Sequence, residues 1–255
     1  MNSQDPNVAK VELIAQALGE LRERVVFVGG CAVGLLLTDP AAAPPRVTYD
    51  VDLVAEVVAL SAYHRLEREF SRLGFQRDMA ADAPICRWHY QRLEVDLMPT
   101  DPSVLGFANR WYPLAVAGAE RIVLPSGTAI RLIGAASFMA TKFEAFADRG
   151  HDDLLGSHDA EDIINLVDGR PELVAEVASA PGELRRYLAE RCGSLPGPAR
   201  VRRCARRHDH AGRSARRTGA DHTATIEPAG PHGLNRARFD LGSKSHRPRS
   251  RPPPR

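Results

Sequence analysis

The stretch RVTYDVDLV, Arg46–Val54, carries the strongest structural signal in the chain. Apolar or aromatic side chains at every second position are interleaved with polar ones, among them Asp50 and Asp52. Alternation with a period of two predicts a half-buried β-strand over residues 47–54. Because successive side chains of a strand point to opposite faces, both aspartates are expected on the same face.

Two carboxylates side by side favour a bound cation. They repel each other and raise each other's pKa unless a positive charge holds them. A small set of hard oxygen ligands suits Mg²⁺ or Mn²⁺. Two aspartates on the solvent side of an edge strand would show the same pattern, so Asp50 and Asp52 alone leave this alternative open.

A third aspartate strengthens the metal hypothesis. Asp96 lies in LEVDL, residues 93–97, where apolar residues again alternate with carboxylates. A neighbouring strand here would bring Asp96 beside the first pair and complete a site for two-metal phosphoryl transfer. One of the three aspartates could then activate an attacking hydroxyl group. Glu94 lies on the same strand face as Asp96 and is the competing candidate. The alternative for Glu94 is a solvated carboxylate without a role in the site.

Two adjacent glycines lie between a predicted strand and a predicted helix. Gly29 and Gly30 follow the apolar run VVFV, residues 25–28. Glycine at this position lets backbone N–H groups approach an anion at a helix N-terminus. A tight turn would also need glycine, so the significance of the pair rests on its place in the order of motifs.

Apolar spacing predicts the other elements of the first 191 residues. Further strands are expected at residues 25–28, 75–79, 85–90 and 93–98, with a hairpin at 122–124 and 129–132. Helices are expected at residues 8–21, 31–37, 60–73, 135–147, 159–167, 171–178 and 182–190. This order predicts an α/β (α+β) fold, in which a mixed sheet with flanking helices is followed by an all-helical part.

The order of these motifs resembles the DNA polymerase beta-like nucleotidyltransferase superfamily, and within it the AbiEii/AbiGii-type toxin nucleotidyltransferases. Three stretches carry the resemblance: FVGGCAVGLLL (27–37), RVTYDVDLV (46–54) and KFEAFADRGHDDLLGSHDAEDIINLVDGRPEL (142–173). It implies a nucleotidyltransferase-type mixed sheet and a helical subdomain. The superfamily often has Gly-Ser where this chain has Gly-Gly, so a serine contact to the γ-phosphate is absent.

The resemblance also assigns roles. Asp50 and Asp52 match the metal-binding pair, and Asp96 matches the third metal-binding carboxylate, which is also the general base. Lys142 matches a helical lysine that reaches the triphosphate, and we count it with the catalytic residues. Taken by itself, Lys142 is explained better as a surface lysine whose aliphatic stem packs on the helix than as a functional charge.

Nucleotide binding is expected to involve further residues. Gly29 and Gly30 match the phosphate-facing turn, and Lys142 and Asp162 match the helical part of the nucleotide site. Asp159 and Asp162 form the D-x-x-D pair one helical turn apart. Favourable interaction with a helix N-terminus is a sufficient alternative reason for acidic residues there.

The expected activity is transfer of a nucleoside monophosphate from an NTP to a hydroxyl group, with Mg²⁺ or Mn²⁺ as cofactor. The resemblance implies an RNA acceptor, such as a tRNA end, or a protein acceptor, and a toxin role with an antitoxin as a candidate partner. A housekeeping or antibiotic-modifying transferase is the alternative within the same superfamily. The alternative from another class is a catalytically degenerate relative that binds a nucleotide or nucleic acid. A binder has no need of all three aspartates, which favours the enzyme.

Charge divides the chain near residue 191. Residues 192–255 hold 15 basic and 4 acidic residues, whereas residues 1–191 hold 19 basic and 28 acidic ones. Only six large apolar residues occur after position 191, too few for a packed core. We therefore expect a catalytic domain at 1–133, a helical subdomain at 134–191 and a disordered Arg/Pro-rich tail at 192–255.

Three interpretations of this tail remain open. It is a basic arm that binds nucleic acid through phosphate contacts, a solvated tail without a role, or sequence outside the evolved reading frame. GC-rich DNA read out of frame gives this mixture of Arg, Pro, Gly, Ala and His.

Several classes of protein are disfavoured by the composition. The longest apolar stretch, Val25–Leu37, has 13 residues, whereas a membrane-spanning helix needs about 20. The first residues contain neither a basic start nor an apolar signal core. The four cysteines form no CxxC pair, which argues against a zinc site or a disulfide framework. We expect a cytoplasmic protein with reduced thiols and no membrane partner.

Overall fold

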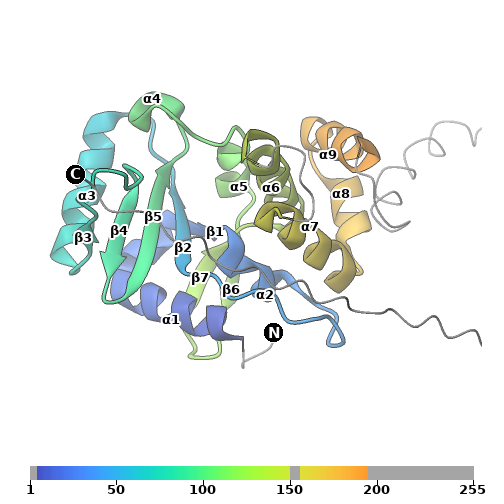
Figure 1. Ribbon diagram of the computed structural model, residues 1–255, viewed down its shortest axis with the longest axis horizontal. Helices are drawn as coiled ribbons and strands as arrows, with labels where there is room; N and C mark the ends of the chain where they lie inside the picture. Colours follow the sequence, from blue (N-terminus) through green and yellow to red (C-terminus); the bar gives the residue numbers. More distant parts are fainter. Residues whose placement is uncertain (1–4, 150–155, 195–255) are drawn as a thin grey trace, which may run out of the picture. The chain divides into compact units, whose positions relative to one another are not determined.

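The computed structural model describes residues 5–149 and 156–194. The described residues form a mixed seven-stranded sheet with helices packed against it (Figure 1). The strand order is β3-β4-β5-β2-β1-β7-β6. This architecture confirms the predicted α/β (α+β) class with a mixed sheet and flanking helices.

Parallel and antiparallel pairings alternate through the centre of the sheet. β2 runs parallel to β5 and antiparallel to β1, and β1 runs parallel to β7. The outer pairs β3/β4, β4/β5 and β6/β7 are antiparallel. The strands are β1 (Val25–Val28), β2 (Asp50–Ala55), β3 (Gln76–Arg77), β4 (Arg87–Tyr90), β5 (Leu93–Pro99), β6 (Glu120–Val123) and β7 (Ala129–Leu132).

The three central strands hold the core of the sheet. Phe27 of β1, Leu53 of β2 and Leu97 of β5 are all fully buried. Burial of side chains of this size contributes about 1.5–3 kcal/mol each to the stability of the fold. β2 pairs with β5 along its whole length and with β1 from Asp52 to Ala55, which gives the aspartates on its other face a rigid support.

The strand β2 begins at Asp50, later than its alternating pattern predicts. The backbone N–H of Thr48 donates to the side-chain oxygen of Asn7, a fully buried residue of α1. This contact directs the chain toward α1 before it joins the sheet. Val47 and Tyr49, which the pattern placed in a half-buried strand, are consequently 52% and 83% exposed.

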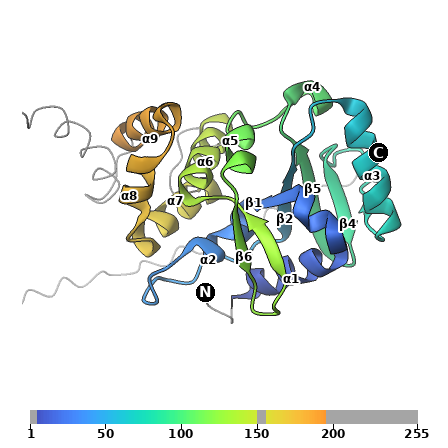
Figure 2. The same cartoon turned by 180° about the vertical axis from the view of Figure 1, so that it is seen from behind.

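Helices lie before, between and after the strands. Their bounds are α1 (Pro6–Leu18), η1 (Gly19–Arg24), η2 (Gly30–Ala32), α2 (Val33–Leu36), α3 (Leu60–Arg72), α4 (Pro102–Leu105), α5 (Tyr112–Ala117), α6 (Ala135–Arg149), α7 (His158–Gly169), α8 (Leu173–Ser179) and α9 (Gly182–Ser194), where η marks 3₁₀ turns. Figures 1 and 2 both show α6–α9 gathered on the side away from α3. Within this group α6 contacts α7, α8 and α9, and it also contacts α5.

Two short helices, α4 and α5, were absent from the sequence-based prediction. The side chain of Asp101 caps α4 by accepting from Ser103 N–H, with Pro102 at the first helical position. Gly106 ends this helix in the left-handed conformation. Each is a recognised start or stop signal, but one turn of helix offers too few residues for a periodic apolar pattern.

The last described helix crosses the predicted boundary at residue 191. α9 continues to Ser194, and Cys192 is fully buried. The rest of the predicted tail, from residue 195 onward, lies outside the described residues. None of the helices in the described ranges combines the length and apolar character that crossing a membrane requires.

Candidate active site

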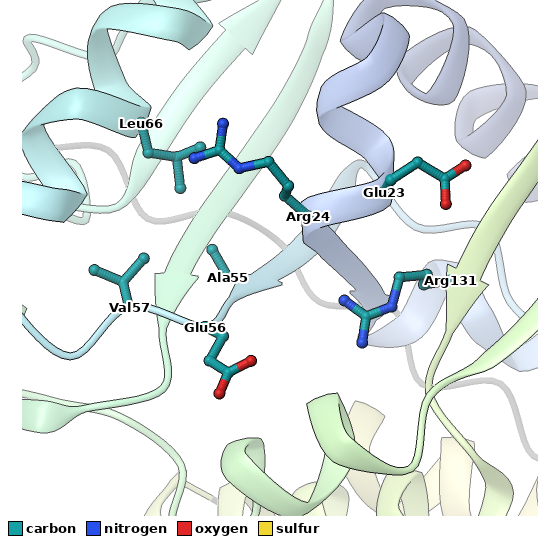
Figure 3. A pocket seen from close by; sticks show the side chains of 7 residues that line it. All are labelled: Glu23, Arg24, Ala55, Glu56, Val57, Leu66 and Arg131. Carbon is teal, nitrogen blue, oxygen red and sulfur yellow. The ribbon is translucent and has the colours of Figure 1, made fainter.

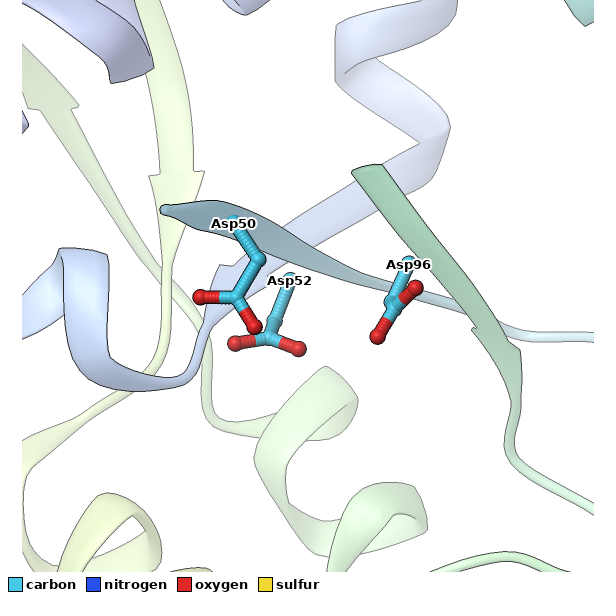
Figure 4. A group of neighbouring side chains, drawn as sticks. All are labelled: Asp50, Asp52 and Asp96. Carbon is cyan, nitrogen blue, oxygen red and sulfur yellow. The ribbon is translucent and has the colours of Figure 1, made fainter. Parts of the chain in front are cut away.

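The register between two neighbouring strands brings three aspartates together. The parallel pairing of β2 and β5 sets Asp52 directly opposite Asp96. Asp50 precedes Asp52 by two residues and therefore faces the same side of the sheet. One carboxylate oxygen from each residue lies within 4.8 Å of the other two (Figure 4). The structure thus assembles the three residues that the sequence analysis selected as metal ligands.

The chemistry of this aspartate triad fits a divalent cation. The pKa of Asp52 is raised, mainly because its carboxylate is removed from water and next because the charge of Asp50 lies close to it. A nearby cation would relieve both effects. Three carboxylates with no sulfur or nitrogen ligand form a donor set that suits Mg²⁺ or Mn²⁺.

Gly29 is required by its close approach to the triad. Its φ of +70° and ψ of −169° lie in a region that is essentially restricted to glycine. A Cβ atom at this position would lie 1.7 Å from Oδ2 of Asp52. At Gly30, a Cβ atom would lie 2.7 Å from Thr48 Cγ2 and 2.8 Å from Arg46 Nη2. Gly29 therefore has a steric role in seating Asp52, and Gly30 has one in admitting Thr48 and Arg46, whichever ligand their N–H groups face.

The helix expected after this turn is shorter than predicted. Residues 31–37 were expected to form one buried helix, whereas the chain forms η2 and then the four-residue α2. A helix of one turn has a small macrodipole, so its N-terminus offers an anion little beyond individual N–H groups. The assignment of Gly29 and Gly30 to phosphate binding stays a prediction.

We expect Gly29→Ala to reduce activity by about 100-fold, because the new methyl group displaces the Asp52 carboxylate by an ångström or more. Gly19→Ala is the matched control, since Gly19 also has a positive φ, of +55°, and has open space around its Cβ position. Both variants should unfold at a lower temperature, from backbone strain of about 1–3 kcal/mol. Equal activities of the two variants would contradict the steric role of Gly29.

A second cluster of charges lies between α6 and α7. Nζ of Lys142 is 3.0 Å from Asp159 Oδ1 and 2.7 Å from Asp162 Oδ2. Nη2 of Arg46 is 3.3 Å from Asp162, and Nη2 of Arg149 is 3.0 Å from Asp159. The side chain of Asp162 has no exposed area. Burial lowers the pKa of Lys142, but the charges of Asp162 and Asp159 outweigh it and raise the pKa overall.

This ion cluster connects the predicted nucleotide-binding residues to one another. Lys142 and Asp162 were each expected at the nucleotide, and they form a buried ion pair. A Cβ atom on Gly30 would lie 3.4 Å from Oδ2 of Asp162, so the cluster borders the glycine turn. The positive charge of Lys142 also lowers the pKa of Asp52, against the larger effects of burial and of Asp50. The two predicted groups of site residues are therefore neighbours, and their roles toward a nucleotide stay predictions.

The third aspartate has a partner that the sequence analysis did not select. Nε and Nη2 of Arg87 each donate to one oxygen of Asp96, both at 2.9 Å. Nη1 of the same guanidinium lies 2.6 Å from Glu94. One signal could have located Arg87. A two-residue turn at 91–92 joins β4 to β5, and counting outward from it pairs position 87 with 96.

A shallow hollow of about 300 Å³ lies at the opposite end of β2 (Figure 3). It is lined by Glu23, Arg24, Ala55, Glu56, Val57, Leu66 and Arg131. Arg24 is paired with Glu69 at 2.6 Å, and Arg131 donates to the carbonyl of Val116 at 2.8 Å. None of the sequence-predicted site residues lines it, and its arginines already have protein partners.

Comparison with solved structures supports the same architecture. An antigenic nucleotidyltransferase-like protein from Paracoccidioides brasiliensis is 22% identical, with a TM-score of 0.51 over 79% of this chain and 94% of that chain. The chain has a nucleotidyltransferase-type fold.

Two structures of the antibiotic-resistance factor ANT(2'')-Ia are more distant. The solution structure is 18% identical over 72% of this chain and 91% of that chain, with a TM-score of 0.46. The complex with adenylyl-2''-tobramycin is 18% identical over 70% and 94%, with a TM-score of 0.43. No family model matches the chain, and no curated protein matches it.

Proposed function

We propose that the protein is a nucleotidyltransferase dependent on Mg²⁺ or Mn²⁺, which moves a nucleoside monophosphate from an NTP to a hydroxyl group and releases pyrophosphate. The convergence of Asp50, Asp52 and Asp96 on one face of the sheet carries this proposal. The fold supports it, because the triad occurs on a nucleotidyltransferase-type sheet.

The proposed division of labour follows the geometry of the triad. Asp50, Asp52 and Asp96 would hold one or two divalent cations. A bound cation would neutralise phosphate charge and hold the triphosphate in line with the attacking oxygen. The acceptor oxygen forms a bond to the α-phosphorus, and the bond from that phosphorus to the bridging oxygen breaks. Asp96, as the proposed general base, takes the hydroxyl proton, and pyrophosphate leaves with the electron pair of the broken bond.

The nucleotide itself would lie between the triad and the ion cluster. In this proposal the backbone N–H groups of Gly29 and Gly30 face the phosphates. Gly29 borders Asp52 of the triad, and Gly30 borders Asp162 of the ion cluster. Lys142 supplies positive charge toward the triphosphate while Asp162 holds its ammonium group in place. These assignments place the glycine turn and the lysine on the same substrate.

We further propose that the acceptor is an RNA, such as a tRNA end, or a protein side chain, and that the enzyme acts as a toxin of the AbiEii/AbiGii type in the cytoplasm. The sequence resemblance over residues 27–37, 46–54 and 142–173 supports this branch. A toxin of this kind would need an antitoxin protein as its partner.

A catalytically inactive nucleotide-binding relative is the second candidate. One observation favours it: both oxygens of Asp96 are engaged by Arg87, which leaves this carboxylate less available as a base or ligand. Against it stands the complete triad, because a protein that only binds a nucleotide does not require three converging carboxylates.

Transfer can be measured by incubating the full chain with each α-³²P-labelled NTP, Mg²⁺ or Mn²⁺, and either total RNA or total protein. We expect label on one class of macromolecule, dependent on the cation and abolished by EDTA. RNase and protease digestion would then identify the acceptor class. Binding of NTP without any transferred label, under both cations and all four NTPs, would favour the inactive relative.

A further inference from the structure

Four carboxylates form a grid on one face of the sheet. The parallel register of β2 and β5 sets Asp50 opposite Glu94 and Asp52 opposite Asp96. Because all four positions have the same parity along their strands, they share one face. Charges of the same sign on directly opposite residues destabilise a sheet. The fold must therefore supply a counter-charge here whenever no cation is bound.

The counter-charge at β5 comes from the next strand. Arg87 of β4 binds both oxygens of Asp96 at 2.9 Å and reaches Glu94 at 2.6 Å with its remaining nitrogen. Its side chain is 20% exposed and that of Asp96 is 12% exposed, so water screens this pair weakly. The guanidinium thus occupies oxygens that a divalent cation would also need.

We propose that Arg87 is the internal counter-ion of this site, which gives up Asp96 and keeps Glu94 when a divalent cation binds. Arg87 and Glu94 together would then set the affinity of the triad for its cation. The inference rests on the proposed function in one respect, namely that the triad holds a divalent cation.

The geometry makes this exchange a small movement. Arg87 already contacts Glu94, so it can leave Asp96 without losing every anionic partner. Glu94 is 39% exposed and has room to follow the guanidinium. Lys142, another cation near the triad, is not free to replace Arg87, because Asp159 and Asp162 hold its ammonium group at 3.0 and 2.7 Å.

The affinity of the full chain for Mn²⁺ alone, measured by titration with electron paramagnetic resonance detection, tests the exchange. Arg87→Gln should bind Mn²⁺ about tenfold more tightly than the wild type, because the competing charge is gone. Glu94→Gln should bind severalfold more weakly, since Arg87 then has Asp96 as its only partner in the grid. Arg77→Gln is the matched control and should leave the affinity unchanged, because Arg77 lies on β3 of the same sheet but pairs with Glu67 of α3.

The double variant Arg87→Gln/Glu94→Gln separates this exchange from general electrostatics. If Glu94 acts through Arg87, the Glu94→Gln effect largely disappears in the Arg87→Gln background. Additive effects, or an Arg87→Gln variant that binds Mn²⁺ more weakly than the wild type, would overturn the inference and leave Arg87 a residue that only orients Asp96. Should Arg87→Gln not fold, Arg87→Lys keeps one charge without the two-pronged contact and should show a smaller gain in affinity.

These outcomes are separable from the fate of the proposed function. Nucleotide transfer by a wild-type protein whose Arg87 variants bind Mn²⁺ unchanged would overturn the exchange alone. The expected order of affinities without any transfer would overturn the enzyme and retain the exchange. A wild-type chain that binds no Mn²⁺ would overturn both.

Discussion

Asp52→Asn should abolish nucleotide transfer, with a loss of at least about 1,000-fold, and leave the fold intact. Asp52 lies at the centre of the triad, between Asp50 on its own strand and Asp96 opposite it. Removing its charge leaves the site with two of its three anionic ligands, and metal-based stabilisation of a phosphoryl transition state amounts to several kcal/mol. The measurement is the rate of label transfer from NTP at saturating Mg²⁺.

The same substitution should not lower the stability of the metal-free protein. Asp52 has a raised pKa because it is removed from water beside Asp50, so its charge costs free energy in the fold when no cation is present. The thermal midpoint in EDTA should therefore be unchanged or higher. Glu56→Gln, just beyond the far end of β2, is the control. It should change neither the rate of label transfer nor the thermal midpoint in EDTA. A collapse of the fold in Asp52→Asn would indicate a structural role for this aspartate.

The triad could be predicted because its signal is local. Period-two alternation around Asp50 and Asp52, and again around Asp96, identified two strands and the faces on which the carboxylates lie. That β2 and β5 are neighbours, and parallel, is a property of the whole sheet. Sequence spacing could therefore propose the convergence, and only the strand order could show it.

The partners of the predicted residues could not be read from spacing. Helical periodicity placed Lys142 and Asp162 on separate helices, but which faces meet depends on how α6 packs against α7. Their ion pair is therefore a tertiary contact without a local signature. The shift in the start of β2 has the same origin, because the side chain of Asn7, about 40 residues earlier, binds the backbone at Thr48.

Lys142→Met should produce the largest loss of stability among single substitutions at the site. It leaves the charge of Asp162, whose side chain has no exposed area, with only the 3.3 Å contact to Arg46. Removing one partner of a buried ion pair costs about 3–5 kcal/mol in the free energy of unfolding. For a folded part of this size, the thermal midpoint should fall by on the order of 10 °C. Transfer should be lost as well.

A control substitution tests whether the loss of stability in Lys142→Met comes from the burial of Asp162. Arg24→Met also breaks an ion pair, to Glu69 at 2.6 Å, but the two side chains are 58% and 37% exposed, so water can solvate the charge that remains. The expected cost is on the order of 1 kcal/mol. A thermal midpoint lowered equally in both variants would contradict the argument from burial.

The double variant Lys142→Met/Asp162→Asn distinguishes a structural lysine from one that serves the substrate. With the buried charge of Asp162 removed, most of the lost stability should return, because no carboxylate without exposed area is left uncompensated. Transfer should stay lost, since the positive charge proposed for the triphosphate is still missing. Recovery of transfer together with stability would mean that Lys142 serves only to neutralise Asp162, and its assignment to the nucleotide would be wrong.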